Sequence, residues 1–360
     1  MTAHIALLVY ISLCGVLVYA HGITRKTNKR FLIFTLSGIF LIEALRKYTV
    51  GLDTFVYYLS FRRIKNDTYG AVVGGWEPLY FLMNKFIGLF TDDPQWILVI
   101  TSAIILTGLG IFIYKNVDES QSLFWHVFIF VTFRQYFNTM NLLRQCIAMA
   151  FACNVYTVLR RDTSKLGILK GILLVVIASL FHTSGIIGAL FFVPFFIEMD
   201  RNKFIFGLFG VAILYILYPY LFRLYIMFFP QYNRYDYTIV SVSNSYLLFG
   251  MINLMLAFLC VIYLDPRNVN NKECYRLLYY VVLSFTTIIL QRRNPLMTRS
   301  GYYFEWFIIL FVPEVLTRFK SLSRALIELS LYVTGWLFFI YSMNAGFIGK
   351  GCVPYLFYWQ

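Results

Sequence analysis

The polar group best suited to bind an anion lies around Arg144. Asn141, Arg144 and Gln145 recur at positions i, i+3 and i+4 at the outer end of an apolar segment, and Ala148 and Ala152 continue the same face. This spacing predicts a helical face with a polar tip and a small-residue stripe packed against protein. Because a guanidinium can bind phosphate oxygens through two parallel hydrogen bonds, we expect Arg144 to contact an anionic substrate. A structural ion pair between helices is the alternative.

Three side chains are candidates for a general base that accepts a proton from a hydroxyl group. His182 lies between two apolar segments at the predicted level of the outer face, and imidazole ordinarily titrates near neutrality. Asp53 and Glu77 lie in a long segment predicted to be on the outer side, where Pro78 suits the first position of a helix that starts near Glu77. The sequence does not select one of the three, and packing or solvated roles are the alternatives.

A second group of cations, Arg292, Arg293 and Arg299, precedes Tyr303. This group resembles an anion-binding site next to aromatic rings that could stack on sugars. No Gly-rich phosphate loop, HExxH, GxSxG or paired-Asp metal motif accompanies it, so we predict neither a nucleotide nor a metal, and no cofactor. Arg46 and Arg134 are further outer arginines that could contact either substrate or neighbouring helices.

The amino-acid composition indicates the class of protein in which these residues lie. The chain has 360 residues, of which 60% are hydrophobic and 13% charged, and its mean hydropathy is +0.70. These values exclude an ordinary soluble domain and indicate a protein that crosses a membrane many times. The net charge of +14 does not predict nucleic-acid binding, because the basic residues are divided among long apolar runs and form no continuous face.

Apolar runs predict an all-α fold of about twelve transmembrane helices in a single domain, residues 1–360. The first run has no preceding basic residue, so we expect a retained span rather than a cleaved signal. The segment 46–94 is expected to include a re-entrant or interfacial helix, and 223–245 and 291–301 are the other outer loops. The predicted spans are 2–20, 31–45, 95–114, 121–138, 141–159, 166–181, 183–197, 204–222, 246–264, 277–291, 302–316 and 325–344.

Charge predicts the orientation of these spans. Placing Arg25 to Arg30 in the cytoplasm puts the basic residues of five further short loops there too, so both termini are expected outside. The remaining basic residues, most of them Arg, lie on or near the outer face, against the usual distribution. We expect several of them to bind an anionic lipid-linked substrate, and others to contact the headgroups of membrane lipids.

The order and spacing of several motifs resemble those of the EpsG-type, Wzy-like polysaccharide polymerases. The resemblance is good over about residues 30 to 200 and looser afterwards. Its motifs are Arg46 with Gly51-x-Asp53 and Tyr57, Glu77-Pro78-x-Tyr80, Asn141-x-x-Arg144-Gln145-x-x-Ala148, Phe181-His182-x-Ser184, Arg299-x-x-Tyr302-Tyr303-x-Glu305, and Pro354-Tyr355.

The resemblance implies a bacterial inner-membrane glycosyltransferase of the GT-C class that needs no metal. Such enzymes transfer a growing glycan from undecaprenyl diphosphate to a new undecaprenyl-diphosphate-linked unit on the outer face, and a chain-length regulator protein is a possible partner. Arg144 and the group of Arg292, Arg293 and Arg299 would then stabilise the diphosphate leaving group. A ligase that passes finished polymer to another acceptor, a transporter of lipid-linked oligosaccharides and a membrane acyltransferase are the rival interpretations.

Overall fold

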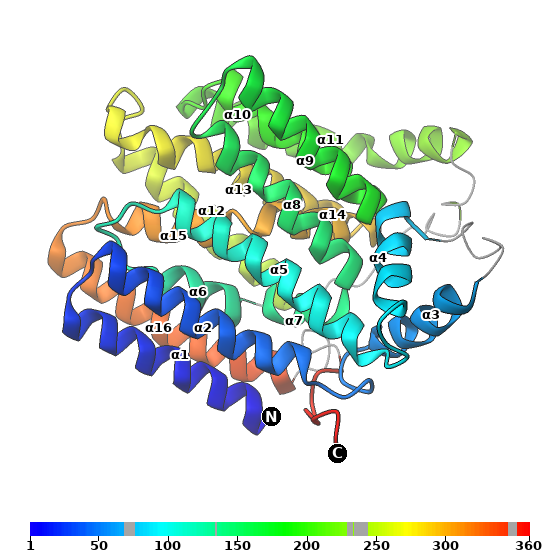
Figure 1. Cartoon of the computed structure of the whole chain (residues 1–360). Coiled ribbons are helices and arrows are strands. Elements are labelled where there is room, and N and C mark those ends of the chain that lie inside the picture. The colour runs from blue at the N-terminus through cyan, green and yellow to red at the C-terminus, as the bar shows by residue number, and fades with distance from the viewer. Residues whose placement is uncertain (68–75, 134, 229–232, 234–243, 345–350) are drawn as a thin grey trace. The chain divides into compact units, whose positions relative to one another are not determined.

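A computed structural model describes residues 1–67, 76–133, 135–228, 233, 244–344 and 351–360. These residues form helices and no strand, apart from an isolated bridge between Arg46 and Phe357 (Figure 1). The contacts between residues divide the chain into two compact units. One unit comprises residues 1–192 and 325–360, and the other comprises residues 193–324. Compact units need not be separate domains, so the expectation of a single domain stays a prediction.

The first unit, which carries the site described below, is built from ten helices in the described part of the chain, followed by α16 (Ser321–Asn344) from Ala325 onward. They are α1 (Thr2–His21), α2 (Arg25–Ala44), α3 (Thr54–Asn66), α4 (Pro78–Gly88), α5 (Gln95–Asn116), α6 (Phe124–Thr132), α7 (Gln135–Asn141), α8 (Leu143–Leu159), α9 (Lys165–Phe181) and the 3₁₀ helix η2 (Thr183–Phe192).

The second unit contains a further set of helices packed around α13. They are α10 (Val193–Phe196), α11 (Arg201–Phe228), α12 (Asn244–Tyr263), the short η4 (Val269–Asn271), α13 (Lys272–Leu290), α14 (Leu296–Glu305) and α15 (Ile308–Leu316).

Five helical segments in the described residues are long and apolar enough to cross a membrane: α1, α5, α11, the segment Val269–Leu290 and α16. Shorter apolar helices accompany them, so an all-helical, multi-pass membrane protein is confirmed. The count of twelve spans stays a prediction. Several predicted spans are divided: 121–138 is broken between α6 and α7, where Phe133 leaves helical geometry at ψ 50°, 183–197 is shared by η2 and α10, and 302–316 is shared by α14 and α15. The predicted span 141–159 begins one residue before the break at Leu142, so its first residue, Asn141, belongs to α7.

Small residues bring the central helices of the first unit close together, as the sequence pattern predicts. A side chain at Gly108 of α5 would lie 2.6 Å from the Cβ of Ala150 on α8. A side chain at Gly188 of η2 would lie 3.0 Å from the Cβ of Ala152, which is fully buried. Close backbone approach of this kind gives van der Waals contact where lipid provides no hydrophobic driving force between helices.

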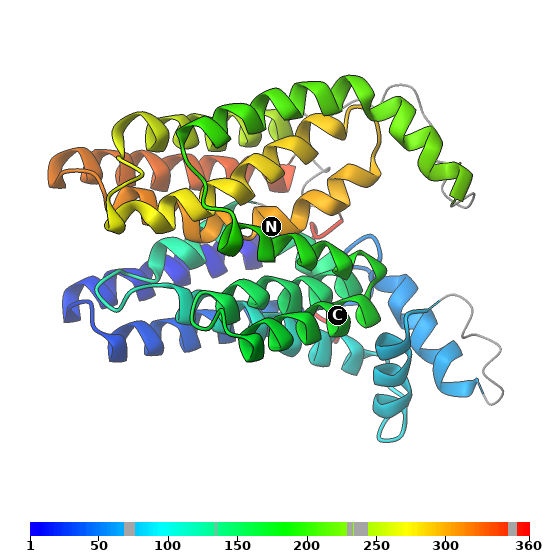
Figure 2. The same cartoon turned by 90° about the horizontal axis from the view of Figure 1, so that it is seen from above.

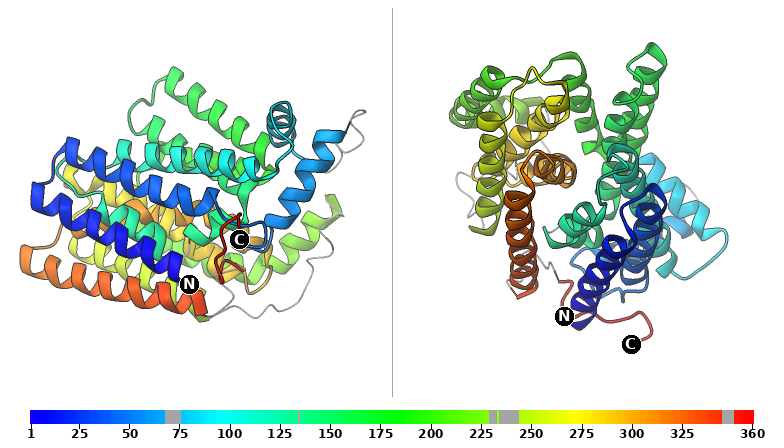
Figure 3. Two further views of the ribbon diagram at one scale, coloured as in Figure 1. Left: turned by 60° about the horizontal axis from the view of Figure 1, so that its bottom comes forward. Right: turned by 90° about the vertical axis from the view of Figure 1, so that its left-hand side faces the viewer.

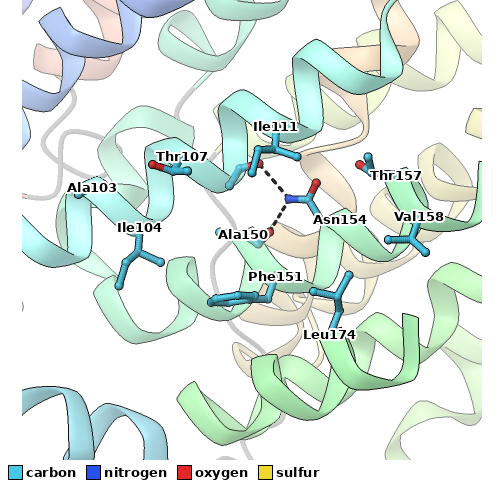
Figure 4. Close-up of a pocket in the computed structure, with 11 residues that line it drawn as sticks. Ala103, Ile104, Thr107, Ile111, Ala150, Phe151, Asn154, Thr157, Val158 and Leu174 are labelled. Atoms are coloured by element: carbon cyan, nitrogen blue, oxygen red, sulfur yellow. Dashed lines mark hydrogen bonds between the residues drawn. The ribbon is translucent and has the colours of Figure 1, made fainter. Parts of the chain in front are cut away.

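Asn154 adds a polar link between α5 and α8 (Figure 4). Its Nδ2 donates hydrogen bonds to the carbonyl oxygens of Gly108 at 2.9 Å and Ala150 at 2.8 Å. It lines a groove of about 500 Å³ between α5, α8 and α9 whose other side chains are apolar or hydroxyl-bearing. The groove carries no charged side chain, so the chemistry predicted from the sequence lies elsewhere.

Helices α3 and α4 lie together at one end of the α5, α8 and α9 group (Figures 1 and 2). Neither is among the five long apolar segments, and α4 has eleven residues, which agrees with the predicted interfacial or re-entrant helix in 46–94. Pro78 occupies the first turn of α4, as predicted, because its missing N–H needs no partner there. The chain termini lie close to each other in this unit (Figure 3).

Candidate functional site

An ion pair between Arg144 and Glu77 forms the centre of the candidate site. Arg144 lies in the first turn of α8, and its Nη1 donates to Glu77 Oε2 at the start of α4. The Arg144 side chain is 24% exposed and that of Glu77 is 12% exposed. The pair is therefore partly shielded from water, where its attraction is stronger than at an open surface, and it can still be reached by a ligand.

Aromatic rings surround the guanidinium of Arg144. The carbon at its centre lies 4.6 Å from the centroid of the Trp76 ring and 5.6 Å from that of Tyr80. These distances are within the range of cation–π attraction, which favours this position of the guanidinium beside the two rings. Asn84, one turn further along α4, is buried and donates a hydrogen bond to the carbonyl oxygen of Tyr80. The face of α4 that carries Tyr80 is therefore buried.

Tyr57 of α3 completes the wall of the site. Its ring packs edge-on against Tyr80 at 6.2 Å, and its hydroxyl lies next to Arg144. Burial raises the pKa of Tyr57 to about 12, while the neighbouring Arg144 acts in the opposite direction. Burial likewise raises the pKa of Tyr80. Both phenols therefore stay neutral near pH 7 and can serve as hydrogen-bond donors.

The α9–η2 turn brings His182 to the same place. Glu77 Oε1 accepts a hydrogen bond from the backbone N–H of Thr183 at 3.3 Å, so Glu77 joins α8 to the residue after His182. His182 is half-buried, and its Nδ1 lies 2.6 Å from Ser184 Oγ. Gly185 allows this turn, because a Cβ there would lie 2.3 Å from the backbone carbon of Ala178. Three predicted site residues, Glu77, Arg144 and His182, are thus brought together from different helices.

Asn141 does not share the face of Arg144, contrary to the helical spacing. Helix α7 ends at Asn141, and Leu142 breaks the helix with φ −107° and ψ 52° before α8 begins. The Asn141 side chain points instead toward the segment after α2, where its Oδ1 accepts from the N–H of Leu52 at 2.7 Å. The prediction of one continuous polar face from residue 141 is therefore wrong, although Ala148 and Ala152 are buried as predicted.

Arg46 is fully buried beside Asn141. Its guanidinium donates to the carbonyl oxygen of Glu43 and, at 2.9 Å, to that of Met140. Both partners are backbone groups of this chain. Its predicted contact with substrate stays a prediction.

The remaining predicted residues of the first unit lie around this site. Asp53 is half-buried at the start of α3 and close enough to Tyr57 to interact with its hydroxyl. Gln145 is buried next to Arg144 in α8. Arg134, the other arginine that we expected to contact substrate, lies outside the described residues.

The second arginine group belongs to the second unit. Arg292 and Arg293 form the turn between α13 and α14, and Arg299 lies in α14. The guanidinium of Arg293 stacks over the ring of Tyr215 at 4.5 Å, while Arg292 and Arg299 are exposed. Tyr303 is fully buried. The predicted anion-binding site therefore has one exposed cation in the turn, Arg292, and one in α14, Arg299, and its role stays a prediction.

Trp76 is the site residue that the sequence reasoning missed. Its position directly before Glu77 and Pro78 is a usable signal, because Trp at the start of an interfacial helix is typical of membrane proteins. Within the described ranges no group of three or more His, Cys, Asp or Glu side chains is arranged to hold a metal ion.

The fold and the site define a multi-pass, all-helical membrane protein with an arginine-centred polar site at the end of its helices. The EpsG family model matches residues 4–357, nearly the whole chain, so the protein belongs to the EpsG family. This membership indicates a membrane protein of polysaccharide biosynthesis that resembles a glycosyltransferase. Searches of curated proteins and of solved structures found no match.

Proposed function

We propose that this protein is a polysaccharide polymerase of the bacterial inner membrane, with its site on the outer face. It would transfer the growing glycan from undecaprenyl diphosphate to a hydroxyl of a new undecaprenyl-diphosphate-linked unit. The observation that supports this proposal most is the Arg144–Glu77 pair, because it places an anion-binding cation and a carboxylate in direct contact. Family membership supports the polysaccharide substrate.

In the proposed reaction Arg144 exchanges its partner. The diphosphate of the donor replaces Glu77 at the guanidinium, whose fork suits two phosphate oxygens. Trp76 and Tyr80 keep the guanidinium in place during this exchange. Glu77, released from the cation, becomes a stronger base.

The chemical step then consists of one proton transfer, the formation of a bond to the acceptor oxygen and the cleavage of a bond to a phosphate oxygen. The acceptor hydroxyl oxygen attacks the anomeric carbon of the donor glycan and gives its proton to Glu77. The bond from the anomeric carbon to the phosphate oxygen breaks, and undecaprenyl diphosphate leaves with its charge stabilised by Arg144. Asp53 and His182 are the alternative bases, and we expect His182 to orient the acceptor through its contact with Ser184.

The rival functions predict different products, so one assay separates them. The purified protein in nanodiscs is incubated with the lipid-linked repeat unit alone in the presence of a chelator, and the products are resolved by gel and by lipid analysis. A polymerase gives a ladder and releases undecaprenyl diphosphate. A ligase needs a different acceptor, and a transporter leaves the substrate unchanged. Absence of a ladder from folded protein with its matching substrate would refute the polymerase.

A further inference from the structure

The C-terminal tail, residues 351–360, lies along the segment that follows α2. The backbone N–H of Lys47 donates to the carbonyl of Leu356 at 2.9 Å, and that of Tyr358 donates to the carbonyl of Leu45 at 2.9 Å. These two bonds form an antiparallel bridge between Arg46 and Phe357. At the other end of the tail the N–H of Gly51 donates to the carbonyl of Gly351 at 3.0 Å. The tail is therefore fixed to residues 45–51 along most of its length.

The same tail reaches the N-terminal helix and the end of α2. His4 of α1 is fully buried, with Nε2 at 2.9 Å from the carbonyl oxygen of Cys352 and Nδ1 at 2.9 Å from the hydroxyl of Tyr136 in α7. The hydroxyl of Tyr355 donates to the carbonyl of Ile42 at 2.9 Å. Buried polar groups that are paired in this way specify one arrangement, because breaking any pair leaves a buried group without a partner.

Arg46 and Asn141 connect this assembly to the end of α7. Arg46 donates to the carbonyl of Met140, and Asn141 accepts from the N–H of Leu52 while its Nδ2 donates to the carbonyl of Phe137 and lies 3.5 Å from Cys352 Sγ. The break at Leu142 follows at once, and Arg144 lies in the first turn of the next helix. The position of Arg144 therefore depends on where residues 140 and 141 are held.

We propose that the C-terminal tail, Arg46 and Asn141 form a positioning device for Arg144. In this proposal Arg46 and Asn141 act through Arg144 and do not touch the substrate. The device sets the direction in which α8 leaves the break at Leu142 and so the distance from Arg144 to Glu77. A displacement of about 1 Å at a reacting group can reduce the rate on the order of 100-fold, so a supporting shell of this kind has a measurable effect.

The test compares the whole chain with three variants. The first lacks residues 351–360, and its matched control lacks only Trp359 and Gln360, which leaves all the bonds named above in place. The third variant is Arg46→Lys, which keeps the charge but loses the fork that reaches two carbonyl groups. Two properties are measured: turnover of the lipid-linked repeat unit, and the rate at which a small maleimide labels Cys146, identified by peptide mass spectrometry. Cys146 is fully buried in the first turn of α8, so its labelling reports on the α7–α8 break.

We expect removal of residues 351–360 and Arg46→Lys each to lower kcat by about tenfold or more, with KM changed less than about twofold. We also expect faster labelling of Cys146 in both variants, and wild-type behaviour in the control. A rise in KM with unchanged kcat in Arg46→Lys would show direct substrate contact and overturn the proposal. So would a fall in kcat without faster labelling of Cys146.

The turnover measurement rests on the proposed function, whereas the labelling measurement does not. If no form of the protein turns over the lipid-linked unit, the proposed function fails and the labelling still tests the device. If loss of residues 351–360 unfolds the protein, Cys153 and Cys274, which are also buried, become labelled with Cys146. The Arg46→Lys variant then tests the proposal: selective labelling of Cys146 supports the positioning device, and unchanged labelling overturns it.

Discussion

Replacing Glu77 by Gln should change binding and catalysis in opposite directions. Gln keeps the size of the side chain but removes the charge that competes with an incoming anion for Arg144. It has one acceptor oxygen in place of the two that accept from Arg144 and from the N–H of Thr183. The variant should therefore bind inorganic diphosphate more tightly than wild type. It should also transfer glycan more slowly, because Gln accepts no proton in the proposed step.

The exposure of the pair gives the size of the expected effect. Side chains that are 24% and 12% exposed lie between open surface pairs and fully buried pairs, so releasing Glu77 costs about 1–2 kcal/mol. Since 1.4 kcal/mol corresponds to a factor of ten, the affinity for diphosphate should rise about 5- to 30-fold. The loss of a general base should lower kcat on the order of 100- to 10,000-fold.

Isothermal calorimetry with inorganic diphosphate and single-turnover kinetics with the lipid-linked unit measure the two effects. Glu314→Gln is a matched control, because Glu314 pairs with Arg318 at the same side-chain exposures of 12% and 24%. This control should leave both properties unchanged. Weaker binding of diphosphate by Glu77→Gln would refute the partner exchange at Arg144, and wild-type turnover would refute Glu77 as the general base.

Three further variants test other parts of the site. Trp76→Leu removes a cation–π contact worth about 0.5–2 kcal/mol, so steady-state assays should give a 2- to 30-fold higher KM for the lipid-linked unit. Gly51→Ala should lower stability by about 1–3 kcal/mol in thermal unfolding, because φ is +100° and the new Cβ would lie 2.6 Å from Thr54 Oγ1. The raised pKa of Tyr57, about 12 against 10.0, contributes stability below pH 10 that is lost as the pH rises toward 12. Wild type should therefore lose more thermal stability than Tyr57→Phe over that range, and equal losses would contradict the assignment.

Local features of the site could be predicted from the sequence because they depend on neighbouring residues. Pro78 begins α4 since its fixed φ and missing N–H suit the first turn of a helix. Ala152 of the predicted small-residue stripe packs against Gly188 because small side chains permit close approach of helices. A partner for Arg144 could be expected from the cost of leaving a cation unpaired at the end of an apolar segment, and Glu77 is that partner.

Long-range features could not be predicted in this way. Glu77 and Arg144 are 67 residues apart, and nothing in the spacing of either motif specifies their pairing. Met140 and Asn141, directly before the break at Leu142, bond to Arg46 and Leu52, which lie 94 and 89 residues away in the chain, whereas helical periodicity alone favours an uninterrupted helix. The contact between His4 and Cys352 spans 348 residues and has no sequence signal.

If Arg144 binds the diphosphate of a lipid-linked substrate, replacing Arg144 must weaken the equilibrium binding of undecaprenyl diphosphate. Wild type, Arg144→Lys and Arg144→Ala are compared in nanodiscs after each is shown to be folded. We predict that Arg144→Ala weakens binding about 10- to 100-fold, the loss of a charge-assisted bidentate contact, and that Arg144→Lys lies between the two. Equal affinity in all three proteins would show that Arg144 does not bind the diphosphate.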